Sequence, residues 1–420
     1  MRRLFVFAAL FTAFSCARAQ EKESMELLRA RVYDVARVQA VYMDSLLMAE
    51  MPDQVGHDVT ADISSVMAGP DRPSSWCCPR TFQGDTLVTS DIGWWTSGFY
   101  PGVLWQIFEK TEDPRFMRLA VKHTLPLAGL LDRETDHDIG FQLMSSFGKM
   151  ARIFPYYDPV GIAECNEEEL SPKAILSRGA AKLAARFIPS AGVIRSWNWG
   201  EWNIPVIIDN MMNLELLMAY GNSAIAEKHA LTTARNHFRD DGTCFHLVDY
   251  ADDGSVLGRQ TVQGFSDDSA WARGQAWALY GYAMMGDWST THEDLYVETA
   301  LKLAEWIMDN LPEDGIPYWD FSQTDYKDAS AAAIIAAGLL RLWEAMDAYT
   351  GEPADPNNPL LRTAERILRT LASPEYLAEP CTNGGFLLKH SVGNLPGRSE
   401  VDVPLTYADY YFLEALDLFP

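Results

Sequence analysis

Asp209 lies within an apolar stretch, residues 204–217, that reads IPVIIDNMMNLELL. β-Branched residues precede it, and Met and Leu follow at the spacing of a buried helical surface. An aspartate at the start of a helix can cap free backbone N–H groups. A carboxylate that faces an enclosed, low-dielectric space can instead act as an acid or a base, because burial raises its pKa. This stretch alone leaves both interpretations open.

Asp138 has a similar setting, in DHDIGF at 136–141, directly before an expected helix. Two carboxyl groups close together in an apolar pocket have pKa values that are pushed apart. One then stays protonated near neutral pH while the other ionises, which supplies an acid and a charge stabiliser. The sequence therefore predicts Asp138 and Asp209 as a catalytic pair. Retaining and inverting glycosidase geometries both stay open at this point.

The densest polar and aromatic segment is 263–277, QGFSDDSAWARGQAW. Arg273 and Trp277 are four residues apart, so they share one face of a helix. Arginine offers a bidentate fork for a carboxylate, and tryptophan offers a flat face for a sugar ring. The alternative is an arginine that pairs with one of the chain's many acids beside a core tryptophan.

Helices are the elements that must position these residues. Helical spacing predicts twelve of them, at 25–50, 96–110, 114–131, 140–154, 172–187, 210–220, 224–239, 268–285, 293–311, 329–349, 360–371 and 404–418. One strand pair is expected, with 243–250 and 256–261 forming a hairpin. The predicted fold class is therefore all-α with a small β-hairpin insertion.

Alternate helices begin beside an acid. These leading acids are Asp91, Asp138, Asp209, Asp268, Asp328 and Asp402. A two-helix unit of about 45 to 75 residues, repeated six times, predicts a closed double ring. If all inner helices run the same way, the six acids meet at one face as a shared pocket. The aromatic and imidazole groups expected beside them are Trp94, Trp95, His137, Trp271, Trp319 and Tyr407.

Length and charge bound the remaining possibilities. The chain has 420 residues and a formal net charge of −24, which disfavours nucleic acid and anionic membranes as partners. No P-loop, dinucleotide fingerprint or G-x-S-x-G motif is present, and His137, His229, His237 and His246 lack the spacing of a metal site. We expect no metal and no cofactor, and one domain over 20–420.

The N-terminus, residues 1–19, has the pattern of a secretory signal peptide. Two arginines precede a short apolar run, and Ala17-Arg18-Ala19 fits a cleavage site. Cys16 could alternatively be the lipidated first residue of a bacterial lipoprotein. We expect export, either to the periplasm or to a lipid-anchored position at the cell envelope. The other cysteines, Cys77, Cys78, Cys165, Cys244 and Cys381, suggest no disulfide framework.

Several motifs in one order resemble the unsaturated glucuronyl hydrolases, glycoside hydrolase family 88. They cover about four fifths of the chain, from residue 91 onward. The motifs are WTSGF (95–99) with Leu104-Trp105, HDIGF (137–141), IIDN (207–210), QG (263–264), WARGQAW (271–277), YWDF (318–321) and ADY (408–410).

The resemblance implies an α/α six-barrel and an unusual glycosidase chemistry. The substrate would be an acidic oligosaccharide from a polysaccharide lyase, with a C4=C5 double bond in its terminal uronic acid. By motif, Asp209 would protonate C4 and then help water add at C5, while Asp138 raises the pKa of Asp209 and holds sugar hydroxyls. Trp95 and Trp277 would stack on the sugar. Polar contacts would come from His137, His246, Gln263 and Arg273.

Two departures from the family pattern affect substrate choice. Some members have a Ser-x-x-Ser-x-Lys stretch associated with sulfated substrates, whereas residues 394–399 here read NLPGRS, with Arg398 and no lysine. Tyr100 stands where a tryptophan is common. An unsaturated rhamnogalacturonyl hydrolase acting on pectin fragments and a non-catalytic carbohydrate-binding barrel remain as alternatives, and the oligomeric state is open.

Overall fold

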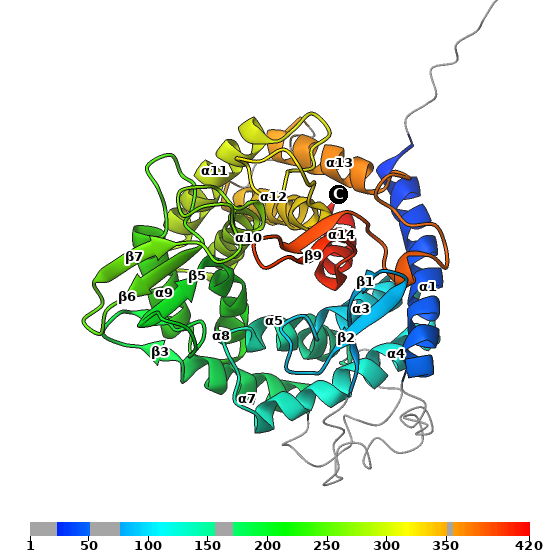
Figure 1. Ribbon diagram of the computed structural model, residues 1–420, viewed down its shortest axis with the longest axis horizontal. Coiled ribbons are helices and arrows are strands. Elements are labelled where there is room, and N and C mark those ends of the chain that lie inside the picture. Colours follow the sequence, from blue (N-terminus) through cyan, green and yellow to red (C-terminus); the bar gives the residue numbers. More distant parts are fainter. Residues whose placement is uncertain (1–22, 51–75, 156–170, 351–354, 356) are drawn as a thin grey trace, which may run out of the picture.

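Alternate helices along the chain fall into an inner and an outer ring (Figure 1). The computed structural model describes residues 23–50, 76–155, 171–350, 355 and 357–420, so the expected signal peptide, Cys16 and Cys165 lie outside the described residues. The inner ring contains α3 (Phe99–Thr111), α5 (Ile139–Leu143) with η2 (Met144–Gly148) and α6 (Lys149–Ile153), η5 (Ile208–Asn213) with α8 (Leu214–Tyr220), α10 (Ala272–Trp288), α12 (Ala329–Thr350) and α14 (Thr406–Leu418). The outer ring contains α1 (Met25–Glu50), α4 (Pro114–Thr124), α7 (Pro172–Ala184), α9 (Ser223–Asn236), α11 (Glu293–Asn310) and α13 (Pro359–Leu371).

Contacts between neighbours close the inner ring. α12 packs against α10 and α14, α14 packs against α3, and α3 contacts η2; α5 contacts α8, which contacts α10. The alanines of α12 from Ala331 to Ala337 have no exposed surface, and their small side chains let the flanking helices approach closely. The predicted α/α six-barrel of twelve helical units is confirmed within the described residues.

Three outer helices begin in the same way. Asp113, Ser171 and Asn358 each cap a helix by accepting a hydrogen bond from a backbone N–H, and a proline follows at the first helical position. The side-chain cap satisfies one free backbone N–H group of the first turn. Proline leaves no further N–H group unsatisfied at its own position, because it has none. The inner helices α3, α5, α8, α10 and α14 have no such side-chain cap.

Short antiparallel strands precede several inner helices. The predicted hairpin is confirmed as β6 (Leu247–Tyr250) and β7 (Val256–Gln260), and β5 (Ile204–Ile207) joins it to make a three-stranded sheet. Three pairs were not predicted: β1 (Cys78–Gln83) with β2 (Thr86–Ser90), β3 (Phe187–Ile188) with β4 (Val193–Ile194), and β8 (Ser391–Asn394) with β9 (Ser399–Val403). Besides η5, the 3₁₀ helices among the described residues are η1 (Leu125–Asp132) and η6 (Asn383–Gly385). Because these strands lead into η5, α10, α3 and α14, they surround the N-terminal end of the inner ring.

One described segment, Ala329–Met346 of α12, is apolar and long enough to cross a bilayer. However, 78% of this segment is buried inside the protein. Its place in the inner ring explains its composition, because a helix surrounded by other helices is apolar on every side.

Candidate active site

The leading acids of the inner helices do not all share one environment. Asp209 and Asp328 are buried, and Asp138 has 17% of its side chain exposed. By contrast, Asp91, Asp268 and Asp402 are exposed. Asp91 pairs with Arg133 at 3.2 Å, and Asp402 pairs with His390 at 2.7 Å. The predicted pocket of six acids is therefore wrong, because three of them are solvated surface groups.

Neither Asp138 nor Asp209 caps its helix. Asp138 occupies the N-cap position of α5 and Asp209 lies in the first turn of η5, but no cap bond from either side chain is present. The Oδ2 atom of Asp209 is buried and has no hydrogen-bond partner among the described residues. A buried acceptor without a partner is costly, so the capping interpretation is wrong and a functional one is favoured.

Burial raises the pKa of Asp209 from 3.8 to about 7. The positive charge of Arg273, a backbone hydrogen bond and the Trp277 indole act in the opposite direction and only partly offset the burial. Asp209 can therefore hold a proton near neutral pH and release it, which is what a general acid requires.

Asp138 belongs to the same electrostatic unit. Burial raises its pKa well above the usual range, and the charges of Asp136 and Asp209 raise it further, whereas the Asn213 side chain lowers it. Carboxyl groups whose charges interact in this way have linked titrations. The predicted meeting of Asp138 and Asp209, 71 residues apart in sequence, is thus present in the structure.

A glycine allows the two acid-bearing elements to meet. A Cβ atom added to Gly140 would lie 2.5 Å from Oδ1 of Asn213, so only glycine permits this approach of α5 to η5. The same Asn213 oxygen accepts a hydrogen bond of 2.7 Å from the Phe141 backbone N–H. Asn213 thereby fixes the two elements and faces Asp138, a role that its position in the sequence did not reveal.

His246 presents a neutral N–H to Asp209. Its Nδ1 accepts hydrogen bonds from the backbone N–H groups of Val262 (3.0 Å) and Gln263 (3.3 Å), so the ring proton must be on Nε2. Nε2 lies 3.8 Å from Oδ2 of Asp209, too far for a direct hydrogen bond. Burial, followed by the charge of Arg273, lowers the pKa of His246 to about 3, which keeps the imidazole neutral.

His137 has the same relation to Asp138. Its Nε2 lies 3.4 Å from Oδ1 of Asp138, and only 1% of the residue is exposed. Burial, followed by the charge of Arg186, lowers the pKa of His137 to about 3. Each acid of the pair therefore has one neutral imidazole beside it: His137 is the sequence neighbour of Asp138, whereas His246 is 37 residues from Asp209 in the chain.

Arg273 is buried in the site, but its terminal nitrogens are engaged. Nη1 donates to the Val392 carbonyl at 2.5 Å and Nη2 donates to the Gly393 carbonyl at 2.6 Å. The guanidinium also lies over the Trp271 ring at 4.5 Å. The expected fork for a substrate carboxylate is thus occupied by the main chain of β8. Arg273 instead supplies positive charge near Asp209 and anchors the β8–β9 hairpin.

The remaining predicted contacts divide into accessible and buried groups. Trp95 is partly exposed and packs against Tyr407 with ring centroids 4.8 Å apart, so it can offer a face to a sugar. Gln263 donates to the Gly393 carbonyl at 3.3 Å. Trp277 has no exposed surface, because Phe141 and Tyr411 cover its ring. The prediction that Trp277 stacks on the sugar is therefore wrong. Its ring is buried in the core next to Asp209.

Three tryptophans at the rim were missed by the sequence reasoning. Trp197 and Trp199 stack with ring centroids 4.7 Å apart, and Trp202 meets both rings edge-on. Trp197 lies 6.5 Å from His137, and Trp199 is 61% exposed. The signal was the density of tryptophan in WNWGEW at 197–202. Trp197 is buried, so Trp199 offers the exposed flat face that could contact a sugar ring.

Among the residues that the structure describes, no three His, Cys, Asp or Glu side chains gather in a way that could hold a metal ion.

Comparison with known proteins agrees with this geometry. No family model matches the chain. It is 39% identical over 343 residues to the unsaturated glucuronyl hydrolase of Formosa agariphila, covering 77% of this chain and 79% of that protein. It is 30% identical to the unsaturated chondroitin disaccharide hydrolase of Streptococcus pneumoniae, covering 80% and 84%. The crystal structure of an unsaturated glucuronyl hydrolase specific for heparin superposes with a TM-score of 0.76 at 36% identity, over 92% of this chain and 96% of the other. The chain is a glycoside hydrolase and belongs to the family of unsaturated glucuronyl hydrolases.

Proposed function

We propose that the protein removes the 4,5-unsaturated uronic acid from the non-reducing end of lyase-generated, glycosaminoglycan-type oligosaccharides. The observation that carries the proposal is the pair of Asp138 and Asp209, with the pKa of Asp209 raised to about 7 in the buried setting that a proton donor needs. The relatives named for chondroitin disaccharides and for heparin support this substrate class.

The proposed reaction is hydration of the C4=C5 double bond. Protonated Asp209 donates its proton to C4, and positive charge develops at C5 and the ring oxygen. Water then adds at C5 and its proton returns to the Asp209 carboxylate. The resulting hemiketal opens to a ketone, and the freed hemiacetal at C1 releases the neighbouring sugar. Asp138 is the partner carboxyl group: it holds sugar hydroxyl groups, and in its ionised form it stabilises the cationic stage, in the manner of a second glycosidase carboxylate.

The neutral imidazoles suit this role better than charged ones. A protonated His246 or His137 would stabilise the carboxylate form of its acid and lower the pKa that the donor requires. As a neutral group, His246 still donates a hydrogen bond from Nε2. Water or a substrate hydroxyl can bridge the 3.8 Å between His246 and Asp209.

The direct test is the loss of the ultraviolet absorbance of the unsaturated uronate when enzyme is added to lyase-generated disaccharides. The panel contains chondroitin and heparin disaccharides, each with and without sulfate, and a pectin-derived unsaturated rhamnogalacturonyl disaccharide. We expect turnover of glycosaminoglycan disaccharides to exceed that of the pectin fragment. Faster turnover of the pectin fragment would favour the rhamnogalacturonyl type, and binding without turnover across the panel would favour a carbohydrate-binding barrel.

We further propose that the chain is exported, either to the periplasm or as a lipoprotein through Cys16. The support is the arginine-led apolar run at 1–19 and the enzyme's dependence on extracellular polymers as the source of its substrate. Mass spectrometry of the mature N-terminus distinguishes the two forms: a soluble form begins after Ala19, and a lipoprotein begins at an acylated Cys16.

A further inference from the structure

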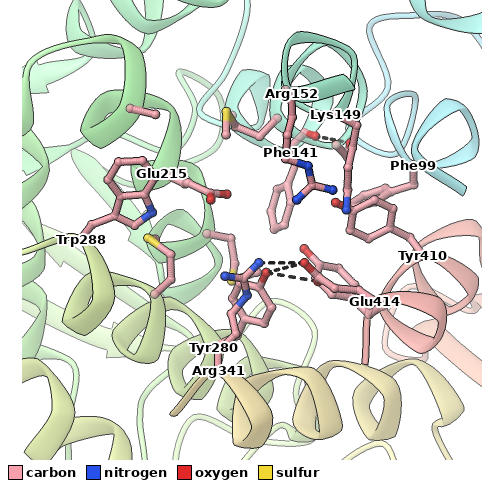
Figure 2. A pocket seen from close by; sticks show the side chains of 18 of the residues that line it. Phe99, Phe141, Lys149, Arg152, Glu215, Tyr280, Trp288, Arg341, Tyr410 and Glu414 are labelled. Atoms are coloured by element: carbon pink, nitrogen blue, oxygen red, sulfur yellow. Dashed lines mark hydrogen bonds and ion pairs between the residues drawn. The ribbon is translucent and has the colours of Figure 1, made fainter. Parts of the chain in front are cut away.

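A second cavity of about 340 Å³ lies at the opposite end of the inner ring from the acid pair. Its walls come from all six inner helical units (Figure 2). They include the ends of three of them, at Arg152 of α6, Tyr220 of α8 and Trp288 of α10. Asp138 and Asp209, in contrast, lie at helix beginnings. A space of this size is in the range of small-molecule sites.

An aromatic layer separates this far cavity from the active site. Phe99 and Phe141 line the far cavity on one side. On the other side they pack against Trp95, with centroid distances of 5.9 and 5.6 Å, and Phe141 also packs against Trp277 at 5.1 Å. The far cavity is therefore a compartment of its own, not an extension of the substrate site.

Ion pairing in the far cavity leaves one cation, Lys149, and one carboxyl group, Glu215, without an ion pair among the described residues. Arg341 pairs with Glu414 at 2.8 Å, and Arg152 pairs with Glu109 at 2.7 Å. Lys149 has no ion pair with any described residue; its ammonium lies 5.5 Å from the centre of the Tyr410 ring. Burial of Lys149 lowers its pKa, and burial of Glu215 raises the pKa of that carboxyl, so the charge across from Lys149 is reduced. The cations Lys149, Arg152 and Arg341 are matched in number by the carboxyl groups of Glu109, Glu215 and Glu414, and Lys149 is the cation that forms no ion pair with a described residue.

The helix that carries Lys149 is irregular at this point. Residues Met144–Gly148 form a π-helical turn, η2, between α5 and α6, and Met144, Ser145 and Gly148 line the far cavity. A π turn interrupts the regular hydrogen-bond ladder and is frequently found at functional sites. Lys149 and Arg152 follow this turn, and their side chains enter the same space, with the Glu215 carboxyl on the opposite wall (Figure 2).

We propose that the far cavity binds a small, hydroxylated organic carboxylate of the size of a sugar acid, with its carboxylate beside Lys149. The aromatic faces of Phe141 and Tyr410 suit the ring or carbon chain of such a ligand. Glu215, Ser145 and the Tyr280 hydroxyl, which otherwise contacts Glu414 at 3.1 Å, provide partners for its hydroxyl groups. A negatively charged ligand would give Lys149 an ion pair, which no described residue gives it.

Titration calorimetry with D-glucuronate as the probe tests this site. The set comprises the wild-type protein, Lys149→Met, Arg152→Gln, Asp209→Asn, and Lys173→Met as a control at an exposed lysine of α7. We expect Lys149→Met to weaken glucuronate binding at least tenfold and Arg152→Gln to weaken it severalfold. Lys173→Met and Asp209→Asn should bind like the wild type, and neutral glucose should not bind at all.

The outcomes separate the far cavity from the active site. Loss of glucuronate binding in Asp209→Asn, with retention in Lys149→Met, would place the acid in the active site and overturn the proposal. Absence of binding to the wild type would also overturn it, and would leave Lys149 as a residue that only stabilises helix C-termini. If Lys149→Met does not fold, as judged by circular dichroism, Arg152→Gln decides, because its side chain is 61% exposed. Turnover of unsaturated disaccharides is measured separately and does not depend on either result.

Discussion

Asp209 and Glu414 are buried carboxyl groups at opposite ends of the same ring, with 8% and 6% of their surfaces exposed. Burial raises the pKa of both. At Glu414 this is outweighed by the charges of Arg341 and Lys149 and by hydrogen bonds from Arg341 and Tyr280, so its pKa falls below the usual range. At Asp209 the partners are too few, and the pKa rises to about 7. Equal burial thus yields a structural ion pair at one end and a proton donor at the other.

The largest expected effect is on turnover at the Asp209 end. Asp209→Asn removes the proton donor while keeping the shape of the side chain, so kcat should fall about 1,000-fold. Asp268→Asn, which changes an exposed acid before an inner helix, should leave kcat unchanged. Initial rates on unsaturated disaccharides measure both. Wild-type turnover in Asp209→Asn would show that Asp209 is not the proton donor, and the contrast with Glu414 would be lost.

At the other end, Glu414→Gln should cost stability and spare the chemistry. Removing one partner of a buried ion pair leaves Arg341 uncompensated, and about 3 kcal/mol of unfolding free energy should be lost at pH 7. Because the pKa of Glu414 is lowered by folding, this contribution is present above its unfolded pKa and disappears as pH falls through the folded one. Urea unfolding at pH 7 and pH 4 measures it. Glu109→Gln, at the exposed pair with Arg152, is the matched control and should lose less than 1 kcal/mol.

The pH dependence of kcat/KM reports the acid pair directly. Since Asp209 acts in its protonated form, activity should decline as pH rises through about 7. Asp138→Asn removes the neighbouring negative charge, which lowers the pKa of Asp209 and shifts this alkaline limb to lower pH, besides slowing the reaction. An unchanged limb in Asp138→Asn would mean that the two carboxyl groups do not titrate as a pair.

The smallest expected effect lies at the rim. Trp199→Ala removes an exposed stacking face worth about 1 kcal/mol, so KM for an oligosaccharide should rise about fivefold with kcat little changed. Trp288→Ala is the counterpart at the far end, where the ring is 40% exposed, and should leave KM unchanged. Equal effects of the two substitutions would argue against a sugar platform at Trp197, Trp199 and Trp202.

Helix positions were predictable because the two-helix unit repeats. The outer helix predicted at 293–311 is observed as Glu293–Asn310, and the inner helix predicted at 329–349 as Ala329–Thr350. The helix predicted at 140–154 is present but contains the π turn at Met144–Gly148, which apolar spacing does not reveal. The strand pairs that were missed are short; β8, for example, has four residues, and pairing across a loop decides its structure.

The acids of the site were predictable from their positions in motifs, but their partners were not. Arg273 binds carbonyl oxygens 119 and 120 residues away, and a main-chain carbonyl is present at every residue, so no sequence signal marks it. The burial of Trp277 likewise depends on Phe141 and Tyr411, which reach it from other helices. Spacing alone placed Trp277 beside Arg273 and could not show which face was covered.

The β8–β9 hairpin is anchored to Arg273 through backbone carbonyl groups. This anchoring does not depend on which side chains the hairpin carries. Arg398, Glu400 and Asp402 have left-handed φ angles of 52°, 57° and 55°, so the loop and second strand follow a tightly defined path. Because the anchor points are the carbonyls of Val392 and Gly393, residues at the tip, 394–399, are free to mutate while the guanidinium stays in place. Sequence changes at the hairpin tip can therefore alter substrate specificity while the catalytic residues stay in place.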